Sequence, residues 1–358
     1  MIYKGQDPIK LEHLLTRPAH SIINQSFDSR LRVDMRRPIN GDGFGVGYYP
    51  EVAEPFEERG PCIYCATTPA WNNLNLDRLA SKTRSELVFA HVRASTSGVL
   101  SETNCHPFEY HTLMFMHNGG VSYFPKIKRK LCDYIAEEYF LTIQGSTDSE
   151  ACFALFLDAL SRLGVDPSDS QGQFPHELLE QAMRNTIDLL VKWSLEAAAE
   201  MGIKDPEPSL LNFAVTDGES VVVTRYISSK VEQAASLYYS TGTRFFEYEP
   251  GQYKMERQNR LNSIVMVASE PLTFERSDWI AIPTNTILVI RKNPSVLIKP
   301  IVDQFYVSDP TKTRSSELTV KKGFASPLVK PNLHSQLGSQ RGVPPLGREG
   351  RKLEVTTV

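Results

Sequence analysis

Residues 113–120 read Leu-Met-Phe-Met-His-Asn-Gly-Gly, an apolar run of four residues followed by a polar corner. Residues 87–93 repeat this pattern with Leu-Val-Phe-Ala-His-Val-Arg. Short apolar runs bounded by turn-forming residues are typical of buried strands. Because residues at the end of a buried strand are held rigidly, His117, Asn118 and Arg93 are well placed for chemistry.

A third polar segment, Gly145-Ser146-Thr147-Asp148-Ser149-Glu150, predicts the start of a helix over 147–163. The spacing from Thr147 to Glu150 is that of a capping box. With Asn104-Cys105-His106-Pro107, these segments combine a cation, a small-polar turn and an Asn-Gly corner. Together they predict a pocket for a small zwitterion beside an oxyanion site.

The order of periodic segments predicts the fold class. Further helices are predicted over 74–82 and from Pro175 onward, and Asp217-Gly218 predicts a hairpin turn. Strands, then two long helices, then strands indicate an α+β sandwich of two antiparallel sheets between helical layers. The predicted strands lie at 87–92, 113–116, 211–216, 220–226, 237–240, 264–269, 279–282 and 286–290.

Composition bounds the class of protein. The 358 residues carry a formal charge of −3, so nothing favours nucleic acid as the main partner. No apolar run approaches about 18 residues, and residues 1–5 lack a signal core, so we expect neither a membrane-spanning helix nor a leader. Five cysteines, an odd and sparse set, favour a cytoplasmic protein. We predict one large domain over 1–325 and a disordered tail over 326–358, which is rich in Pro, Gly, Ser and basic residues.

These segments, with residues 15–26 (Leu-Thr-Arg-Pro-Ala-His-Ser-Ile-Ile-Asn-Gln-Ser) and 268–273 (Ala-Ser-Glu-Pro-Leu-Thr), make the chain resemble the class II glutamine amidotransferases. That family is a branch of the N-terminal-nucleophile hydrolases. The resemblance extends over about residues 1–320 and is nearest to the amidotransferase-like subunit of the fungal cytosolic glutathione-degradation complex. It implies an αββα fold, hydrolysis of a γ-glutamyl amide, no cofactor, and a peptidase-like partner subunit.

The resemblance also implies roles for residues. Arg93 would bind the α-carboxylate of a γ-glutamyl group with two donors, and Asp148 would pair with its ammonium. The Asn118 side-chain amide and the Gly119 backbone N–H would form the oxyanion hole. Ser95 and His117, from the same segments, are the remaining predicted substrate-binding residues.

The chain departs from the family at its nucleophile. The family uses an N-terminal cysteine in a Cys-Arg-Phe start, which by likeness would lie three places before Met1. There the α-amine, with a pKa of about 7.7–8, serves as base for the thiol, and internal Cys105 has no such amine. Either the start is misassigned, or the protein is an inactive scaffold or regulatory subunit that retains the pocket. A third alternative keeps the hydrolase and changes its substrate to glutamine or another γ-glutamyl thiol.

Plainer interpretations stay open for each residue. Arg93 could be a structural ion-pair partner, Asn118-Gly119 a simple turn, and Asp148 a helix-dipole residue. The histidines at 91, 106 and 117 lack H-x-H or H-E-x-x-H spacing, so we expect hydrogen-bonded histidines of the pocket wall or core and no metal.

Two further motifs receive structural interpretations. Cys62 and Cys65 are predicted to be small core residues. The glycines over 41–47 precede Tyr-Tyr-Pro rather than a helix, which favours close packing beneath the pocket over phosphate binding.

Overall fold

The computed structural model describes residues 1–28, 40–50, 59–93, 100–258, 262–308 and 314–324. All of them belong to one compact unit, Met1–Pro327. The predicted tail lies outside the described residues.

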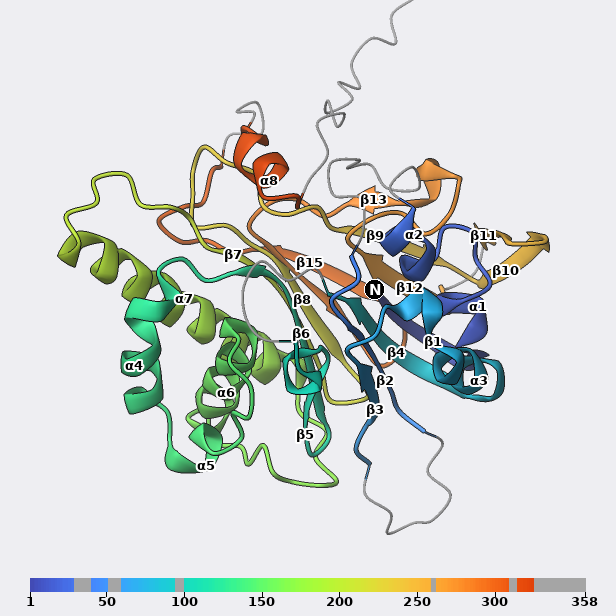
Figure 1. The fold of residues 1–358 in the computed structure, drawn as a ribbon, viewed down its shortest axis with the longest axis horizontal. Coiled ribbons are helices and arrows are strands. Elements are labelled where there is room, and N and C mark those ends of the chain that lie inside the picture. Colours follow the sequence, from blue (N-terminus) through green and yellow to red (C-terminus); the bar gives the residue numbers. More distant parts are fainter. Residues whose placement is uncertain (29–39, 51–58, 94–99, 259–261, 309–313, 325–358) are drawn as a thin grey trace, which may run out of the picture. The chain divides into compact units, whose positions relative to one another are not determined.

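Two antiparallel sheets form the centre of this unit (Figure 1). The seven-stranded sheet has, in spatial order, β13 (Ile280–Ala281), β9 (Tyr238–Gly242), β12 (Ile264–Ala268), β1 (Ile2–Lys10), β4 (Arg84–Val92), β2 (Phe44–Tyr48) and β3 (Cys62–Ala66). The six-stranded sheet has β15 (Val296–Pro300), β14 (Thr286–Ile290), β8 (Val221–Arg225), β7 (Leu210–Thr216), β6 (Leu113–Gly120) and β5 (Phe108–Tyr110). A separate hairpin pairs β10 (Arg244–Glu249) with β11 (Gln252–Glu256).

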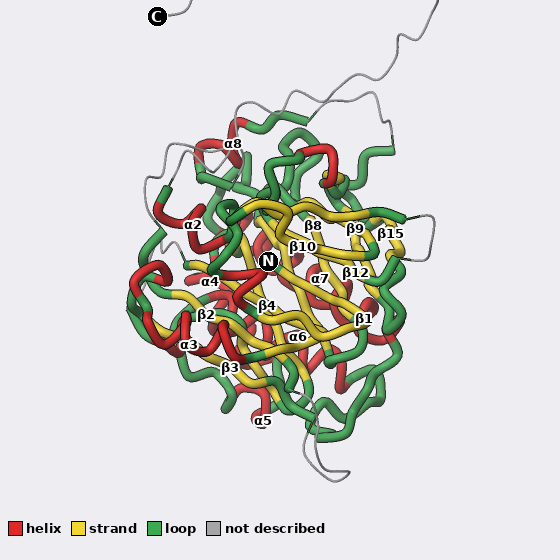
Figure 2. Tube along the Cα trace, turned by 90° about the vertical axis from the view of Figure 1, so that its right-hand side faces the viewer, coloured by secondary structure: helices red, strands yellow, loops and turns green. Residues whose placement is uncertain are grey.

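Helices cover the outer face of each sheet. The six-stranded sheet packs against α4 (Phe124–Tyr134), α5 (Glu137–Phe140), α6 (Asp148–Ser161) and α7 (His176–Glu200). The seven-stranded sheet packs against α1 (Glu12–Leu15), α2 (Ile22–Phe27) and α3 (Leu74–Lys82). The other helices in the described part of the chain are α8 (Glu317–Lys321) and the 3₁₀ turns η2 (Ala70–Asn72), η3 (Glu102–Asn104) and η4 (Arg276–Asp278). The view turned by 90° shows the N-terminus among the strands, with α6 and α7 behind them (Figure 2).

Strand alternation explains this layering. Along β6, Met114 and Met116 face the apolar core between the sheets, whereas Leu113 and Phe115 face the helical layer. Each sheet therefore buries both faces, as the near-continuous apolar strands require. The predicted α+β fold, an αββα sandwich, is confirmed.

Several element predictions are confirmed with small shifts. Helix α3 spans the predicted 74–82, and α6 begins one residue after its cap Thr147. The turn at Asp217–Gly218 joins β7 and β8 as an antiparallel hairpin. The β10–β11 hairpin was not predicted, although Tyr253 and Met255 alternate with polar residues along β11 as in a half-buried strand.

The prediction of two core cysteines is wrong for Cys62, which is exposed. Cys62 and Cys65 stand three residues apart on β3. Residues three apart on a strand point to opposite faces, so both could not enter one core.

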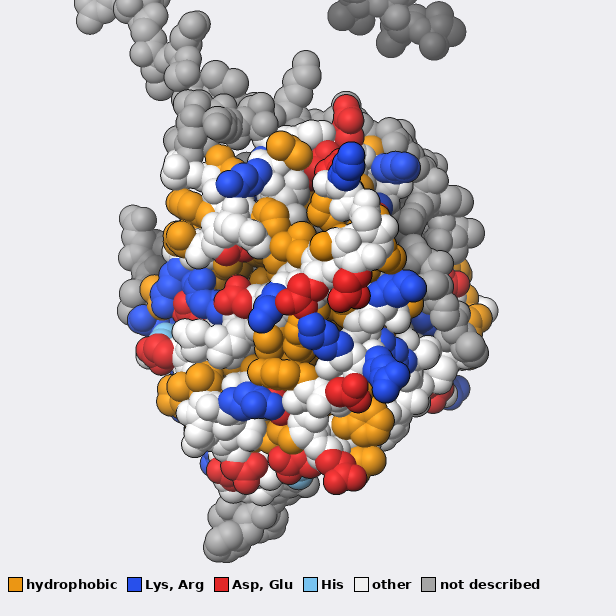
Figure 3. Space-filling model, turned by 90° about the vertical axis from the view of Figure 1, so that its left-hand side faces the viewer, with side chains coloured by type: hydrophobic (Ala, Val, Ile, Leu, Met, Phe, Trp, Pro, Cys, Tyr) orange, Lys and Arg blue, Asp and Glu red, His pale blue; other side chains and the backbone are white. Residues whose placement is uncertain are grey.

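The outer face of the α4–α7 layer carries basic and acidic side chains interspersed with apolar ones (Figure 3). Among the described residues, none of the helices has both the length and the apolarity needed to cross a bilayer.

Candidate functional site

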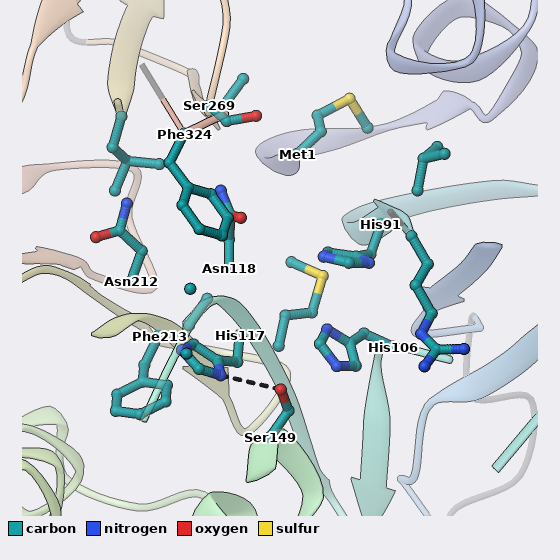
Figure 4. Close-up of a pocket in the computed structure, with 18 of the residues that line it drawn as sticks. Met1, His91, His106, His117, Asn118, Ser149, Asn212, Phe213, Ser269 and Phe324 are labelled. Carbon is teal, nitrogen blue, oxygen red and sulfur yellow. Dashed lines mark hydrogen bonds between the residues drawn. The ribbon is translucent and has the colours of Figure 1, made fainter. Parts of the chain in front are cut away.

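A cavity of about 610 Å³ opens where the two sheets end together, beside the N-terminus (Figure 4). Residues from β1, β4, β6, β7, the end of β12 and the start of α6 line it. The cavity brings together five of the six predicted site residues: Arg93, His117, Asn118, Gly119 and Asp148. Ser95 lies outside the described residues.

The end of β6 presents the two predicted oxyanion donors. Asn118 is two and four residues from Met116 and Met114 on the same strand, so its side chain points to the same face, between the sheets. The Asn118 side-chain amide makes no hydrogen bond within the described part of the chain, which leaves its donors available to a ligand.

Gly119 has no room for a side chain. Its φ is +154°, and a Cβ placed there would lie 1.9 Å from the Leu210 carbonyl oxygen. Strands β6 and β7 therefore approach each other closely at this point, where Gly119 pairs with Leu211. The glycine is required by packing, and it leaves the backbone of 119 uncovered toward the cavity.

Asp148, the first residue of α6, is tied to β6. Its Oδ2 accepts a hydrogen bond from the Val121 backbone N–H at 2.8 Å and lies 3.8 Å from the Cβ position of Gly120. The helix itself is capped by Thr147, whose Oγ1 accepts from the Glu150 N–H at 3.3 Å. Asp148 is thus not needed as the cap, and its carboxylate is held next to the oxyanion donors.

The predicted capping box is confirmed only in its first half. The Glu150 carboxylate does not return to Thr147 but accepts hydrogen bonds from the Gln144 and Gly145 N–H groups, both at 2.7 Å. These bonds fix the loop that leads into α6.

His117 is buried, and both of its ring nitrogens have partners. Nε2 lies 3.0 Å from the Leu210 carbonyl oxygen, which only accepts, so Nε2 carries the hydrogen. Nδ1 lies 2.9 Å from the Ser149 hydroxyl. Burial lowers the pKa of His117, the Asp148 carboxylate partly offsets this shift, and Nδ1 of the neutral ring accepts from Ser149. The geometry favours a role in positioning β6 against α6, and the predicted contact with substrate stays a prediction.

Arg93 follows the last residue of β4 and is 7 % exposed. Its backbone N–H donates at 2.9 Å to the carbonyl of Gly43, the residue just before the glycine-rich strand β2. A Cβ at Gly45 would lie 2.2 Å from the His106 carbonyl oxygen. The prediction of close backbone packing beneath the pocket is therefore confirmed.

Two histidines line the cavity next to Arg93, as predicted. The rings of His91 and His106 lie 4.3 Å apart between centroids. The prediction that these histidines are hydrogen-bonded fails at Nδ1 of both rings, which has no partner within the described ranges. Burial lowers the pKa of His91 to about 3, and the neighbouring Met1 amine, His117 and Arg93 lower it further. Burial likewise lowers the pKa of His106. Both rings are neutral at neutral pH.

Other residues of the cavity were not predicted. Ser269 and Glu270 follow β12, and only their place in the quoted 268–273 segment pointed to them. Asn212 lines the cavity with its amide already engaged by the Ala235 carbonyl and the Tyr226 N–H. Phe324 enters from α8, and no sequence signal indicated it. No described cysteine lines the cavity, and no described cluster of three His, Cys, Asp or Glu residues could hold a metal ion.

The N-terminal end of β1 reaches the cavity. Met1 lines it, and the Met1 amino group donates to the Ala90 carbonyl at 2.7 Å. Burial lowers the pKa of this amine to about 5. Strand β1 lies at the centre of its sheet, between β12 and β4.

Comparison with known proteins agrees with this geometry. Residues 12–312 match the family model described as glutamine amidotransferases class-II. The chain is 58% identical to a probable glutamine amidotransferase, DUG3, of Saccharomyces cerevisiae, over 100% of this chain and 98% of that protein.

Solved structures support the fold. A glutamine aminotransferase class-II domain protein from Silicibacter pomeroyi aligns with a TM-score of 0.50 and 24% identity, covering 84% of this chain and 98% of that one. An allosteric regulatory enzyme of purine biosynthesis aligns with a TM-score of 0.51 and 14% identity, covering 84% of this chain and 48% of that one. The family-model match over residues 12–312 and the 58% identity to DUG3 show that the chain belongs to the class II glutamine amidotransferases.

Proposed function

We propose that the protein hydrolyses γ-glutamyl amides, with glutathione as its main substrate and glutamate and cysteinyl-glycine as products. The observation that carries the proposal is the shared cavity of Arg93, Asp148, Asn118 and Gly119. A γ-glutamyl group presents an α-carboxylate, an α-ammonium and a side-chain carbonyl, and this cavity offers a complementary group for each.

Each residue has a defined part in the reaction. Arg93 binds the α-carboxylate and Asp148 the ammonium, so the γ-carbonyl is directed to the end of β6. A cysteine thiolate attacks that carbonyl, and Asn118 and Gly119 donate to the resulting oxyanion. The C–N bond then breaks, the amine leaves with a proton, and water hydrolyses the thioester to glutamate and regenerates the thiol.

The proposed nucleophile is a cysteine three positions before Met1. Strand β1 pairs Ile2 with Phe89 in antiparallel register. If that register continued, the third position before Met1 would lie opposite Arg93. It would share the face of Ile2, which packs in the core between the sheets. A cysteine there would thus face the side to which Asn118 belongs.

The second candidate is a non-catalytic subunit that binds γ-glutamyl ligands. It is favoured by the lack of any cysteine among the described residues that line the cavity. Burial also raises the pKa of the nearby thiols Cys65 and Cys105, which makes them poor nucleophiles. In either case we propose a cytoplasmic protein that acts in a complex with a peptidase-like partner subunit.

The test adds Cys-Arg-Phe before Met1 and processes the extended chain so that the cysteine is its first residue. The extended chain is purified with and without the peptidase-like partner subunit. Glutamate release is measured from glutathione and from glutamine. The matched control carries Ser in place of the added cysteine and should release none.

Arg93→Ala in the extended chain should raise KM for both substrates, since it removes a shared contact. Hydrolysis by the extended chain supports the proposal, whereas ligand binding without hydrolysis supports the non-catalytic subunit. If the extended chain neither binds glutathione or glutamine nor releases glutamate from them, both candidate functions are refuted.

A further inference from the structure

One wall of the cavity comes from a segment beyond the family match at residues 12–312. Gly323 and Phe324 line the cavity, and the Phe324 ring is turned into it on the side of Asn118 and Asn212 (Figure 4). The family model therefore does not account for this wall.

The end of α8 sets the direction of Phe324. Gly323 has a φ of +77°, the left-handed conformation that ends many helices. The Phe324 N–H donates to the Thr319 carbonyl at 2.7 Å, and the Gly323 N–H donates to Val320 at 3.1 Å. These two bonds define a Schellman motif, which reverses the chain just after the helix and turns the next residue back toward the fold.

The segment is held by the residues that lead into β9 and packs against the cluster of Leu210, Ile227 and Ala234. The Phe324 carbonyl accepts from the Ser236 N–H at 2.9 Å and from the Ser236 hydroxyl at 3.1 Å. Thr319 is fully buried, and the Arg314 guanidinium donates to the Glu232 and Phe305 carbonyls. The ring is thus presented by a fixed backbone.

The chemistry of this side differs from that of the γ-glutamyl contacts. Its lining is mainly apolar, with Leu237 next to Ser236 and with Ala214 and Val223 from β7 and β8. The carboxylate of Glu270, which follows β12, also lines the cavity. Asn212 has its amide engaged within the protein. A cavity of about 610 Å³ is within the range that holds drug-sized ligands, and it exceeds what a glutamyl group alone fills.

We propose that Phe324 and its neighbours form the leaving-group subsite, which selects γ-glutamyl compounds whose amine portion bears an uncharged, sulfur-containing side chain. A thiol beside an aromatic ring is a favourable contact, and ammonia, the leaving group of glutamine, would not reach it. This inference rests on the proposed function for its choice of γ-glutamyl ligands. It adds a specificity-determining residue from outside the family's matched region.

The test measures binding of glutathione and of glutamate by calorimetry, in the wild-type chain and in Phe324→Ala and Phe324→Leu. Phe324→Ala should raise the Kd of glutathione about 10-fold and leave that of glutamate within about 2-fold. The Kd of glutathione for Phe324→Leu should lie between those of the wild type and Phe324→Ala. This milder variant keeps the test valid if Phe324→Ala fails to fold. Phe140→Ala is the matched control, because Phe140 of α5 is 44 % exposed and does not line the cavity, and it should change neither Kd.

Binding separates this inference from the proposed function. If the cysteine-extended chain hydrolyses nothing but glutathione binding still depends on Phe324, the proposed hydrolysis fails and the subsite stands. Equal effects on both ligands, no effect on either, or no binding of glutathione by the wild-type chain would overturn the subsite.

Discussion

The close approach of β6 and β7 at Gly119 makes a quantitative prediction. A Cβ at Gly119 would lie 1.9 Å from the Leu210 oxygen, and real Cβ contacts stay above 3.0 Å, so the strands must separate by at least 3.0 − 1.9 = 1.1 Å. The same Cβ would lie 2.9 Å from His117 Nε2, which bonds Leu210 at 3.0 Å. Overpacking and a strained φ together cost about 2–5 kcal/mol.

Gly119→Ala should therefore lower the melting temperature by about 3–8 °C, because a domain of this size loses about 1.5 °C per kcal/mol. Gly120→Ala is the adjacent control, since its Cβ would meet only Asp148 Oδ2 at an ordinary 3.8 Å. Thermal unfolding followed by circular dichroism measures both variants. A melting temperature for Gly119→Ala within 1 °C of wild type, or an equal loss in Gly120→Ala, would refute the steric argument.

Three further predictions follow from the site. Thr147→Ala removes the cap of α6 and should lower the free energy of unfolding by about 1 kcal/mol in urea titrations, whereas Thr142→Ala, outside the helix, should cost less. Asp148→Asn should raise the Kd of a γ-glutamyl ligand about 10–100-fold with little change in stability, because the amide oxygen still accepts from Val121; an unchanged Kd would contradict the ammonium contact. Burial lowers the pKa of His91 from 6.5 to about 3. Between these two pH values His91 binds a proton in the unfolded chain but not in the folded chain, so the free energy of unfolding falls as the pH drops. The loss should reach up to about 2 kcal/mol at pH 5. The urea midpoint should depend less on pH in His91→Asn, and an equally steep dependence would show that His91 is not the group responsible.

Local patterns were sufficient for much of the fold. The period-3.6 spacing, the Thr147 cap and the Asp217–Gly218 turn each involve residues within a few positions of one another. The polar residues at the ends of the 87–92 and 113–116 runs also predicted the site, because buried strands of a sandwich end at its edges. Resemblance to a family then supplied roles that spacing alone left open between a ligand and a structural residue.

The sequence by itself determined the α+β class, the long helices, several strands and the Asp217–Gly218 turn, since these depend on short-range periodicity. The polar ends of two strands, together with the family resemblance, indicated five of the residues that line the cavity. Only the tertiary structure decided that the Gly119 backbone meets Leu210, that Asp148 is tied to Val121, and that Phe324 enters the same cavity. Phe324 and Asn118 are separated by about two hundred residues of chain. Such contacts depend on strand order and register between distant segments, and no local pattern of side chains encodes them.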